Sequence, residues 1–168
     1  MKKTILILFL FISKSIFSQN GYESWDKTYT LSNAEKIIQA EVDYAKEVEK
    51  ENPKGRYYIA MEKFRFLAEF TGRERAITDE TLSSMKRVFK MKTGSSKILN
   101  NLVSKEFEFN IGSSKIWMPM QNPLIEAFKN EVKVNSKVLL YALFTNEHKF
   151  KGGIINTFLI SEFLTDWD

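Results

Sequence analysis

The sequence contains no cysteine and a single histidine, and these absences exclude several kinds of chemistry. Without cysteine the chain has no disulfide, no thiol nucleophile, no thiolate metal ligand and no thioether-linked haem. A zinc site needs several His or Cys ligands, so His148 alone cannot supply one. The serine-nucleophile pattern Gly-x-Ser-x-Gly is also missing. We therefore expect no metal and no cofactor, and we assign no catalytic residue.

The one long apolar run lies near the amino terminus, from Thr4 to Ile12. It follows Lys2 and Lys3 and is followed by the small residue Ser18, a pattern typical of a secretory signal peptide. The run is too short to span a bilayer comfortably as a permanent helix. The segment resembles signal peptides of exported Gram-negative proteins, in which a small residue followed by Gln often ends the peptide. We predict that residues 1–18 are removed and that the protein is secreted or periplasmic; an uncleaved anchor is the alternative.

Acidic and basic side chains nearly balance in the predicted mature chain. The full sequence carries 25 Lys and Arg against 21 Asp and Glu, and loss of Lys2, Lys3 and Lys14 lowers the basic count to 22. A net charge this close to zero argues against a nucleic-acid partner and against a strongly cationic footprint. The 43% hydrophobic content is that of a globular protein, and 168 residues fit one domain. No membrane span is expected after cleavage.

Hydrophobic periodicity and turn residues predict the order of elements. Residues 19–31 form a polar arm, and a helix begins at Ser32 with a Ser32–Glu35 capping box. A second helix begins at Thr78 and ends before Gly94, and a short third helix begins at Asn122. Strands are predicted at 56–70 (closed by Gly72), 103–111, 116–120, 138–145 and 153–163, with turns at 112–114 and 146–149.

This order predicts a single α+β domain over residues 32–168. If the second helix is an insertion, the elements over 56–163 run β-β-β-α-β-β, which resembles an OB-fold, a small five-stranded barrel with a helix between strands three and four. The resemblance rests on element order and on no specific motif. The alternative is an open five-stranded antiparallel sheet. In both, the N-terminal helix packs on the sheet.

Three carboxylates are candidates for acid–base chemistry. Glu106 and Glu108 point to one side of a strand, about 7 Å apart along it, as a general acid–base pair in sugar hydrolysis could. The ordinary interpretation is a solvated strand face. Glu62 interrupts an apolar face, so it is either half-buried with a cationic partner or placed at a sheet edge. His148 is predicted to lie exposed in a turn.

A strip of basic and aromatic residues is the best candidate for ligand binding. It consists of Tyr57, Lys63 and Arg65 on the first long strand. On an OB-like barrel such a face can stack bases or sugars, although it can equally be an ordinary outward face. The pentapeptide Gly-Ser-Ser-Lys-Ile occurs at 94–98 and 112–116, but it lacks phosphate-loop spacing and indicates turns.

A good core pattern without a catalytic constellation favours an exported, non-enzymatic domain that binds another molecule. The expected partner is a protein or a component of the cell envelope. Two alternatives stay open: a hydrolase that uses Glu62, Glu106 or Glu108, and an inhibitor or immunity-type protein directed at one enzyme. The ligand and the oligomeric state cannot be derived from the sequence.

Overall fold

The computed structural model describes residues 22–51, 57–149 and 153–166. The predicted signal peptide at residues 1–18 lies outside this part of the chain. Within the described ranges, no helix has both the length and the apolar character needed to cross a membrane.

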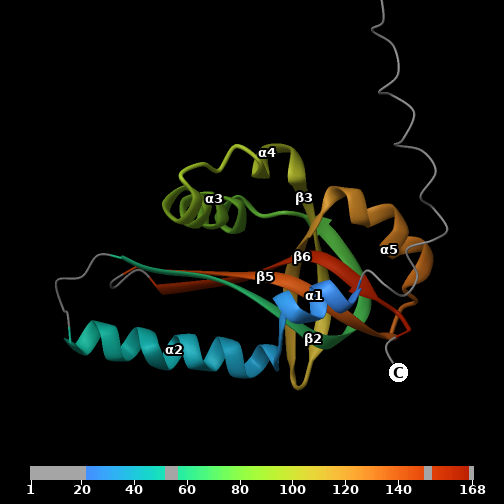
Figure 1. The fold of residues 1–168 in the computed structure, drawn as a ribbon, viewed down its shortest axis with the longest axis horizontal. Helices are drawn as coiled ribbons and strands as arrows, with labels where there is room; N and C mark the ends of the chain where they lie inside the picture. The colour runs from blue at the N-terminus through green and yellow to red at the C-terminus, as the bar shows by residue number, and fades with distance from the viewer. Residues whose placement is uncertain (1–21, 52–56, 150–152, 167–168) are drawn as a thin grey trace, which may run out of the picture.

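Five long strands close into a small barrel, and helices pack around it (Figure 1). The strands are β2 (Tyr57–Ala76), β3 (Val103–Ile111), β4 (Ser114–Gln121), β5 (Lys137–Lys149) and β6 (Gly153–Leu164). They pair in the order β2-β3-β4-β6-β5, and a β2–β5 pairing completes the circuit. The predicted α+β class and small barrel are confirmed. The expectation of purely antiparallel strands is wrong, because β4 and β6 run parallel where they meet.

Strand β2 closes the barrel because it pairs with two other barrel strands, β5 and β3. Its first part pairs with β5, from Tyr57 opposite Lys149 to Glu69 opposite Lys137. Its last part pairs with β3 instead, and the register shifts between Phe70 and Glu74. Gly72 lies in this bend with φ of +85°, a conformation that glycine adopts without steric cost. The predicted strand end at Gly72 is therefore wrong, because the glycine bends the strand and does not terminate it.

The barrel core is rich in phenylalanine. Short helix η1 (Asn122–Leu124) and α5 (Ile125–Glu131) connect β4 to β5 and carry Phe128 into the core. The ring of Phe128 lies 5.1 Å from Phe70, 5.3 Å from Phe107 and 5.2 Å from Phe163, each measured between ring centroids. These edge-on contacts are a preferred aromatic geometry, so one side chain ties three strands together.

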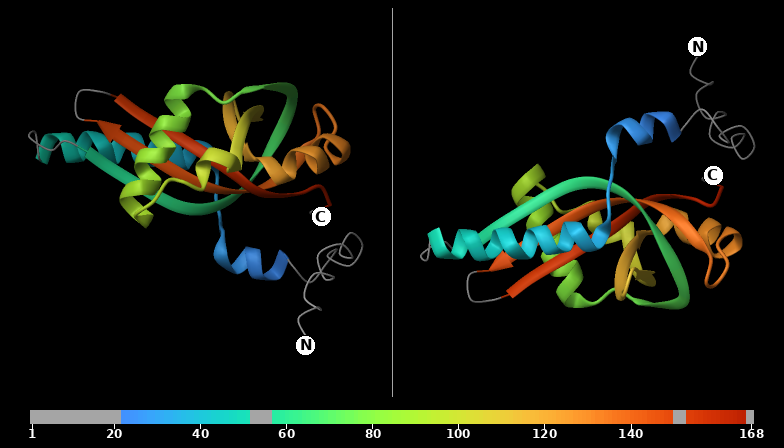
Figure 2. Two further views of the ribbon diagram at one scale, coloured as in Figure 1. Left: turned by 90° about the horizontal axis from the view of Figure 1, so that it is seen from above. Right: turned by 90° about the horizontal axis from the view of Figure 1, so that it is seen from below.

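Helices α2 (Ala34–Glu51) and α3 (Asp79–Thr93) cover opposite faces of the sheet formed by β2, β5 and β6 (Figure 2). Helix α3 packs Met85 and Phe89 against Leu159 of β6. Its predicted ends are confirmed: the Thr78 hydroxyl accepts the N–H of Thr81, and Gly94 has φ of +81°. A short helix, α4 (Leu99–Leu102), follows it. The N-terminal helix α2 packs on the barrel as predicted, through Ala34 and Ile37.

The start of α2 differs from the predicted capping box. Asn33, and not Ser32, accepts the N–H of Lys36 at 3.1 Å. The Glu35 carboxylate instead accepts the N–H of Ser113, at 3.1 Å, in the turn between β3 and β4. A side chain at Gly112 would collide with that carboxylate, so the glycine permits the close approach. Glu35 therefore anchors the helix to the hairpin and leaves its own helix end to Asn33.

The hairpin of β5 and β6 is longer than predicted. Residues 146–149 belong to β5 and do not form a turn. The side chains of residues 146–148 are buried, and each has a partner: Asn146 donates to Asn156, Glu147 pairs with Arg87, and His148 lies 2.8 Å from Glu49. His148 is only 5% exposed, so the prediction of an exposed turn histidine is wrong.

Candidate functional site

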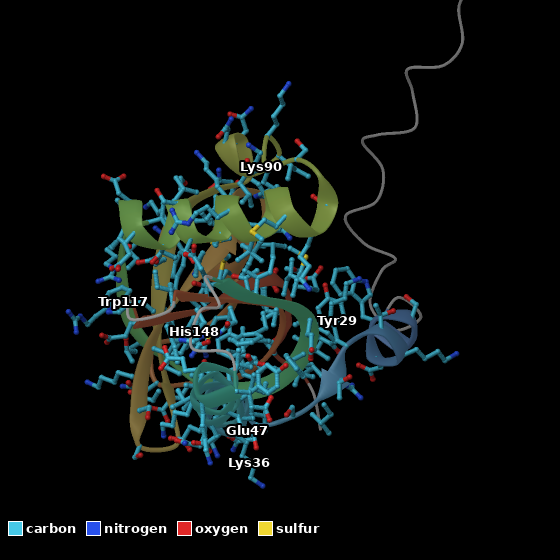
Figure 3. The ribbon with its side chains drawn as sticks, turned by 90° about the vertical axis from the view of Figure 1, so that its left-hand side faces the viewer. Tyr29, Lys36, Glu47, Lys90, Trp117 and His148 are labelled. Carbon is cyan, nitrogen blue, oxygen red and sulfur yellow. The ribbon has the colours of Figure 1, made fainter. Side chains whose placement is uncertain are left out.

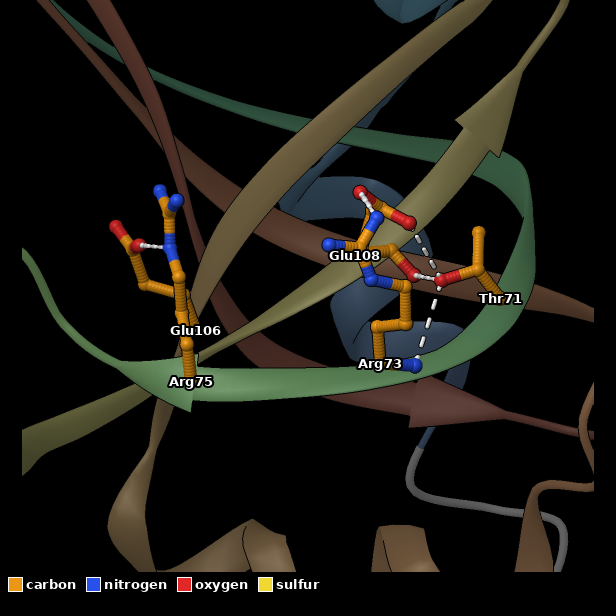
Figure 4. A network of polar contacts seen from close by, with 5 residues as sticks. All are labelled: Thr71, Arg73, Arg75, Glu106 and Glu108. Carbon is orange, nitrogen blue, oxygen red and sulfur yellow. Dashed lines mark hydrogen bonds and ion pairs between the residues drawn. The ribbon is translucent and has the colours of Figure 1, made fainter.

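The outer face of β2, β3 and β4 carries a set of charged and aromatic side chains, and Figure 4 shows its polar members on β2 and β3. The strand register places Arg75 opposite Glu106 and Glu108 opposite Trp117. Because alternate residues of a strand point to one side, these side chains share the face turned away from the phenylalanine core. We call the set the arginine–tryptophan face: Thr71, Arg73, Arg75, Glu106, Glu108 and Trp117.

Both glutamates of this face lie beneath arginines. Arg75 Nε donates to Glu106 Oε2 at 2.7 Å, and Arg73 Nη1 donates to Glu108 Oε1 at 2.9 Å. The Thr71 hydroxyl donates to the other oxygen of Glu108 at 3.0 Å. The glutamate side chains are 1% and 4% exposed, and the arginines are 42% and 65% exposed. The predicted solvated face at Glu106 and Glu108 is therefore wrong, because the arginine side chains fold back over the carboxylates.

Trp117 holds the two guanidinium groups in place. The Cζ atom of Arg75 lies 4.2 Å from the ring centroid of Trp117, and that of Arg73 lies 5.3 Å away. A cation over an aromatic ring gains roughly 0.5 to 2 kcal/mol, more where the site excludes water. Two like charges gathered on one ring would repel, but each is matched by a buried carboxylate. The remaining N–H groups of the two arginines have no hydrogen-bond partner among the described residues and are open to solvent.

The face can offer directional hydrogen-bond donors. Planar guanidinium groups suit carboxylate, phosphate and carbonyl acceptors, and here their orientation is already set. Because the charges of two arginines and two glutamates cancel, hydrogen bonds and stacking, and not net charge, are the attractions that the face can supply. Each carboxylate is bound to a guanidinium and so orders an arginine side chain.

Two residues of the predicted strip, Lys63 and Arg65, lie beside the N-terminal segment, whereas the backbone of Tyr57 pairs with Lys149 at the start of β2. That segment, the predicted polar arm, forms α1 (Tyr22–Thr28) and the two-residue strand β1 (Thr30–Leu31), which pairs with β2 at Phe64 and Arg65. Lys63 Nζ lies 5.6 Å from the ring centroid of Tyr29. The side chain of Tyr57 lies outside the described part of the chain.

Arg65 is engaged by Asp26 of α1. Its Nη1 forms an ion pair with Asp26 Oδ1, and the same oxygen accepts the hydroxyl of Tyr141 at 2.8 Å. Burial and then this hydrogen bond raise the pKa of Tyr141 to about 12, so the phenol remains a neutral donor. A hollow of about 210 Å³ near Lys63 is smaller than the usual ligand pocket. Ligand binding by the strip stays a prediction, and the chain's own α1 occupies part of it.

Glu62 lies on another surface from Glu106 and Glu108. It is exposed on β2 opposite Phe144 and lies close enough to Glu41 of α2 for their charges to interact. Burial, and secondarily the charge of Glu62, raise the pKa of Glu41. The structure thus does not bring the three predicted carboxylates together. In the part of the chain that the structure describes, no group of three or more His, Asp or Glu residues could hold a metal ion.

Sequence reasoning identified Glu106 and Glu108 but missed Arg73 and Arg75, and it weighed Trp117 as a binding anchor only to favour core burial. The missed signal is a matched spacing: Arg73-x-Arg75 directly after Gly72, and Glu106-x-Glu108 on another strand. Oppositely charged residues at the same period of two are good cross-strand partners. The match becomes visible only when the two strands are known to be neighbours.

The chain was also compared with protein-family profiles, with curated proteins and with solved structures. None of the three comparisons gives a significant match.

Proposed function

We propose that this chain is an exported, non-enzymatic binding domain, and that it binds a protein or a component of the cell envelope through its arginine–tryptophan face. One observation carries the proposal. Two guanidinium groups are fixed on Trp117 by buried carboxylates, and both remain open to solvent.

Arginines that are already ordered favour binding, because they lose less side-chain entropy when a partner associates. A free arginine side chain loses about 2 kcal/mol of rotamer entropy when it is immobilised. Here the buried Glu106 and Glu108 have already ordered Arg75 and Arg73, which lowers that loss on association. Arginine and tryptophan are also the residues that most often dominate the affinity of protein interfaces.

The connectivity of the barrel supports an OB-like assignment, which we also propose. Strand β2 pairs with both β3 and β5, and α5 lies between the third and fourth barrel strands. The second and third strands of OB-folds are the usual ligand-binding face. Their counterparts here are β3 and β4, which carry Glu106, Glu108 and Trp117. The assignment and the candidate site therefore point to one surface.

The two alternatives differ in what they require. A hydrolase needs converging carboxylates, and Glu62 lies on another surface from Glu106 and Glu108. An inhibitor or immunity-type protein would use the same exposed arginines against an enzyme, so only the identity of the partner separates it from the leading proposal.

Site-specific photo-cross-linking in the cells that export the protein tests the proposal. Lys115 is exposed and precedes Trp117 by two residues, so it lies on the same side of β4. A benzophenone amino acid at position 115 should form adducts with the partner. The control position is Lys46, which is exposed on α2. Equal adducts from both positions, or adducts from position 46 alone, would contradict binding at this face.

Paired substitutions then test the arginines themselves. Arg73→Gln with Glu108→Gln removes both charges of one ion pair and leaves polar groups of similar shape, so the fold should persist. The matched control, Arg87→Gln with Glu147→Gln, removes an ion pair between α3 and β5. We expect adducts from position 115 to disappear in the first double variant and to remain in the second. Adducts that survive both changes would exclude Arg73 from the interface.

A further inference from the structure

The sheet separates the acidic part of the chain from the basic part. Helix α2 carries six acidic residues and three lysines. Between Glu80 and Glu106 the sequence has no acidic residue and six basic ones. Helices α2 and α3 lie on opposite faces of β2, β5 and β6 (Figure 2), so the net negative charge of α2 and the net positive charge of the α3 segment lie on opposite sides of the sheet. The near balance of the whole chain conceals this separation.

Most cations on the basic side have no internal partner. Arg87 pairs with Glu147, and Lys105 pairs with Glu74. The other four make no ion pair with any described residue, and three of them are exposed. These four are Lys86, Lys90, Lys92 and Lys97. Lys90 stands at the outer edge of the molecule, away from the sheet (Figure 3).

Two large apolar side chains are exposed among these lysines. Met91 is 60% exposed and Ile98 is 63% exposed. The apolar residues by which α3 packs on the barrel are different ones, including Met85 and Phe89, and they are buried. Met91 and Ile98 therefore contribute little to the core. We call the four lysines with Met91 and Ile98 the α3–α4 face.

We propose that the α3–α4 face docks on an anionic phospholipid surface, with its lysines at the headgroups and with Met91 and Ile98 entering the headgroup region. Exposed lysines and exposed apolar side chains within one segment are a pattern of peripheral membrane contact, in which charge attracts and shallow apolar burial retains. Asp79 and Glu80 stand in the first turn of α3, and no further acidic residue follows until Glu106, so the part of the segment that carries the lysines meets little repulsion from an anionic surface. This inference is independent of the proposed partner of the arginine–tryptophan face.

Vesicle co-sedimentation tests the proposal. The chain from Gln19 onward keeps every element that the structure describes and lacks the apolar run from Thr4 to Ile12, which could bind lipid by itself. It is mixed with vesicles of phosphatidylcholine alone, or of equal parts phosphatidylcholine and phosphatidylglycerol. We expect binding to the anionic vesicles only. Binding should weaken with added salt, which shortens the screening length from about 10 Å at 0.1 M to about 3 Å at 1 M.

Two triple variants with equal changes in net charge locate the surface. Each lysine near an anionic membrane contributes roughly fivefold to affinity, so Lys90→Glu, Lys92→Glu and Lys97→Glu together should weaken binding at least about 100-fold. The control is Lys36→Glu, Lys46→Glu and Lys50→Glu on α2, beyond the sheet, where screening should limit the loss to about twofold. Unchanged circular dichroism and thermal midpoints show that both variants fold.

A third variant tests the apolar contribution. Met91→Ser with Ile98→Ser should weaken vesicle binding about tenfold and leave its salt dependence intact. Three results would each overturn the proposal: equal binding to both vesicle types, equal binding by the two triple variants, or no binding to any vesicle. The last result would favour an acidic protein as the occupant of this face.

Discussion

Arg87 of α3 and Glu147 of β5 form a two-point ion pair, with Nε 2.5 Å from Oε1 and Nη2 2.7 Å from Oε2. The side chain of Glu147 is 1% exposed, and that of Arg87 is 40% exposed. The same arrangement, a buried strand carboxylate under a partly exposed arginine, occurs at Glu106 and Glu108. Glu106, Glu108 and Glu147 are thus three buried strand acids that partly exposed arginines cover.

Removal of one such arginine should destabilise the fold. Arg87→Ala leaves the Glu147 charge buried without its main partner, and we expect the free energy of unfolding to fall by roughly 3 kcal/mol. Urea unfolding measures the change. The control Lys86→Ala, one residue away and without an ion pair to the described residues, should stay within about 0.5 kcal/mol. Adding Glu147→Met to Arg87→Ala should recover most of the loss. A single variant as stable as its control would contradict this account.

The pH dependence of stability should report on Glu41. Its pKa is raised above 4.5 in the folded protein, so the folded state holds this proton more tightly than the unfolded chain does. Stability from this group is fully present below its ordinary pKa and is lost as the pH rises through the raised one. At pH 7, Glu41→Gln should therefore be more stable than the original protein by about 0.5 kcal/mol, because the amide carries no charge to be desolvated by burial or repelled by Glu62.

Denaturant unfolding across pH checks the sign of this effect. The advantage of Glu41→Gln should vanish near pH 4, where the original carboxyl is itself protonated in both states. Glu47→Gln, exposed on the same helix, is the control and should show no such pattern. An advantage that stays constant from pH 4 to 7 would assign the effect to packing and not to charge.

The bend of β2 should be sensitive to a side chain at Gly72. Gly72→Ala places a Cβ 2.9 Å from both Cγ atoms of Val134 and forces alanine into positive φ, so we expect a loss of about 2 kcal/mol. Gly94→Ala has a similar φ and nothing within 4 Å of the new Cβ, so it should lose only about 1 kcal/mol. Val134→Ala in the Gly72→Ala background should close that difference. Thermal unfolding of the three variants tests both terms.

The attachment of α1 should depend on Asp26. Asp26→Ala removes the acceptor of the Tyr141 hydroxyl and the ion-pair partner of Arg65, at a cost of about 1 to 2 kcal/mol. Hydrogen exchange should quicken in α1 and β1 and stay unchanged in α5. The variant also frees Arg65, so any ligand of the predicted strip should bind it more tightly. Unchanged exchange in α1 would show that the aromatic contacts of Trp25 and Tyr29 hold the segment without Asp26.

Local signals predicted most of the elements of this fold. The Thr78 cap, Gly94, the turn at Gly112 and the helix that follows Asn122 are specified within a few residues, and all are confirmed. Gly72 was misjudged because a glycine with positive φ serves a bend as well as a strand end. The small barrel was predicted from element order, but the pairing that closes it is a non-local fact.

The errors fall where partners are distant in sequence. Residues 146–148 resemble a turn because they are polar, yet Glu147 meets a residue 60 positions away and His148 one 99 positions away. Glu35 similarly leaves its predicted cap for a hairpin 78 residues further on. At the candidate site, Glu106 and Glu108 were predicted to lie on a solvated face, but the structure buries both side chains. Only the β2–β3 register reveals that Arg75 and Arg73 cover them.

The double pairing of β2 has a consequence for how the protein acquires its shape. Tyr57 of β2 pairs with Lys149 of β5, so the first barrel strand cannot complete its pairing until a strand near the end of the chain has been synthesised. Contacts between residues this far apart in sequence slow folding, because the entropy of the intervening chain is lost before the contacts can form and stabilise the structure. Until β5 emerges during synthesis, the first half of β2 offers an unpaired edge to other chains. A nascent chain arrested before Lys137 should therefore be the most aggregation-prone form of this protein.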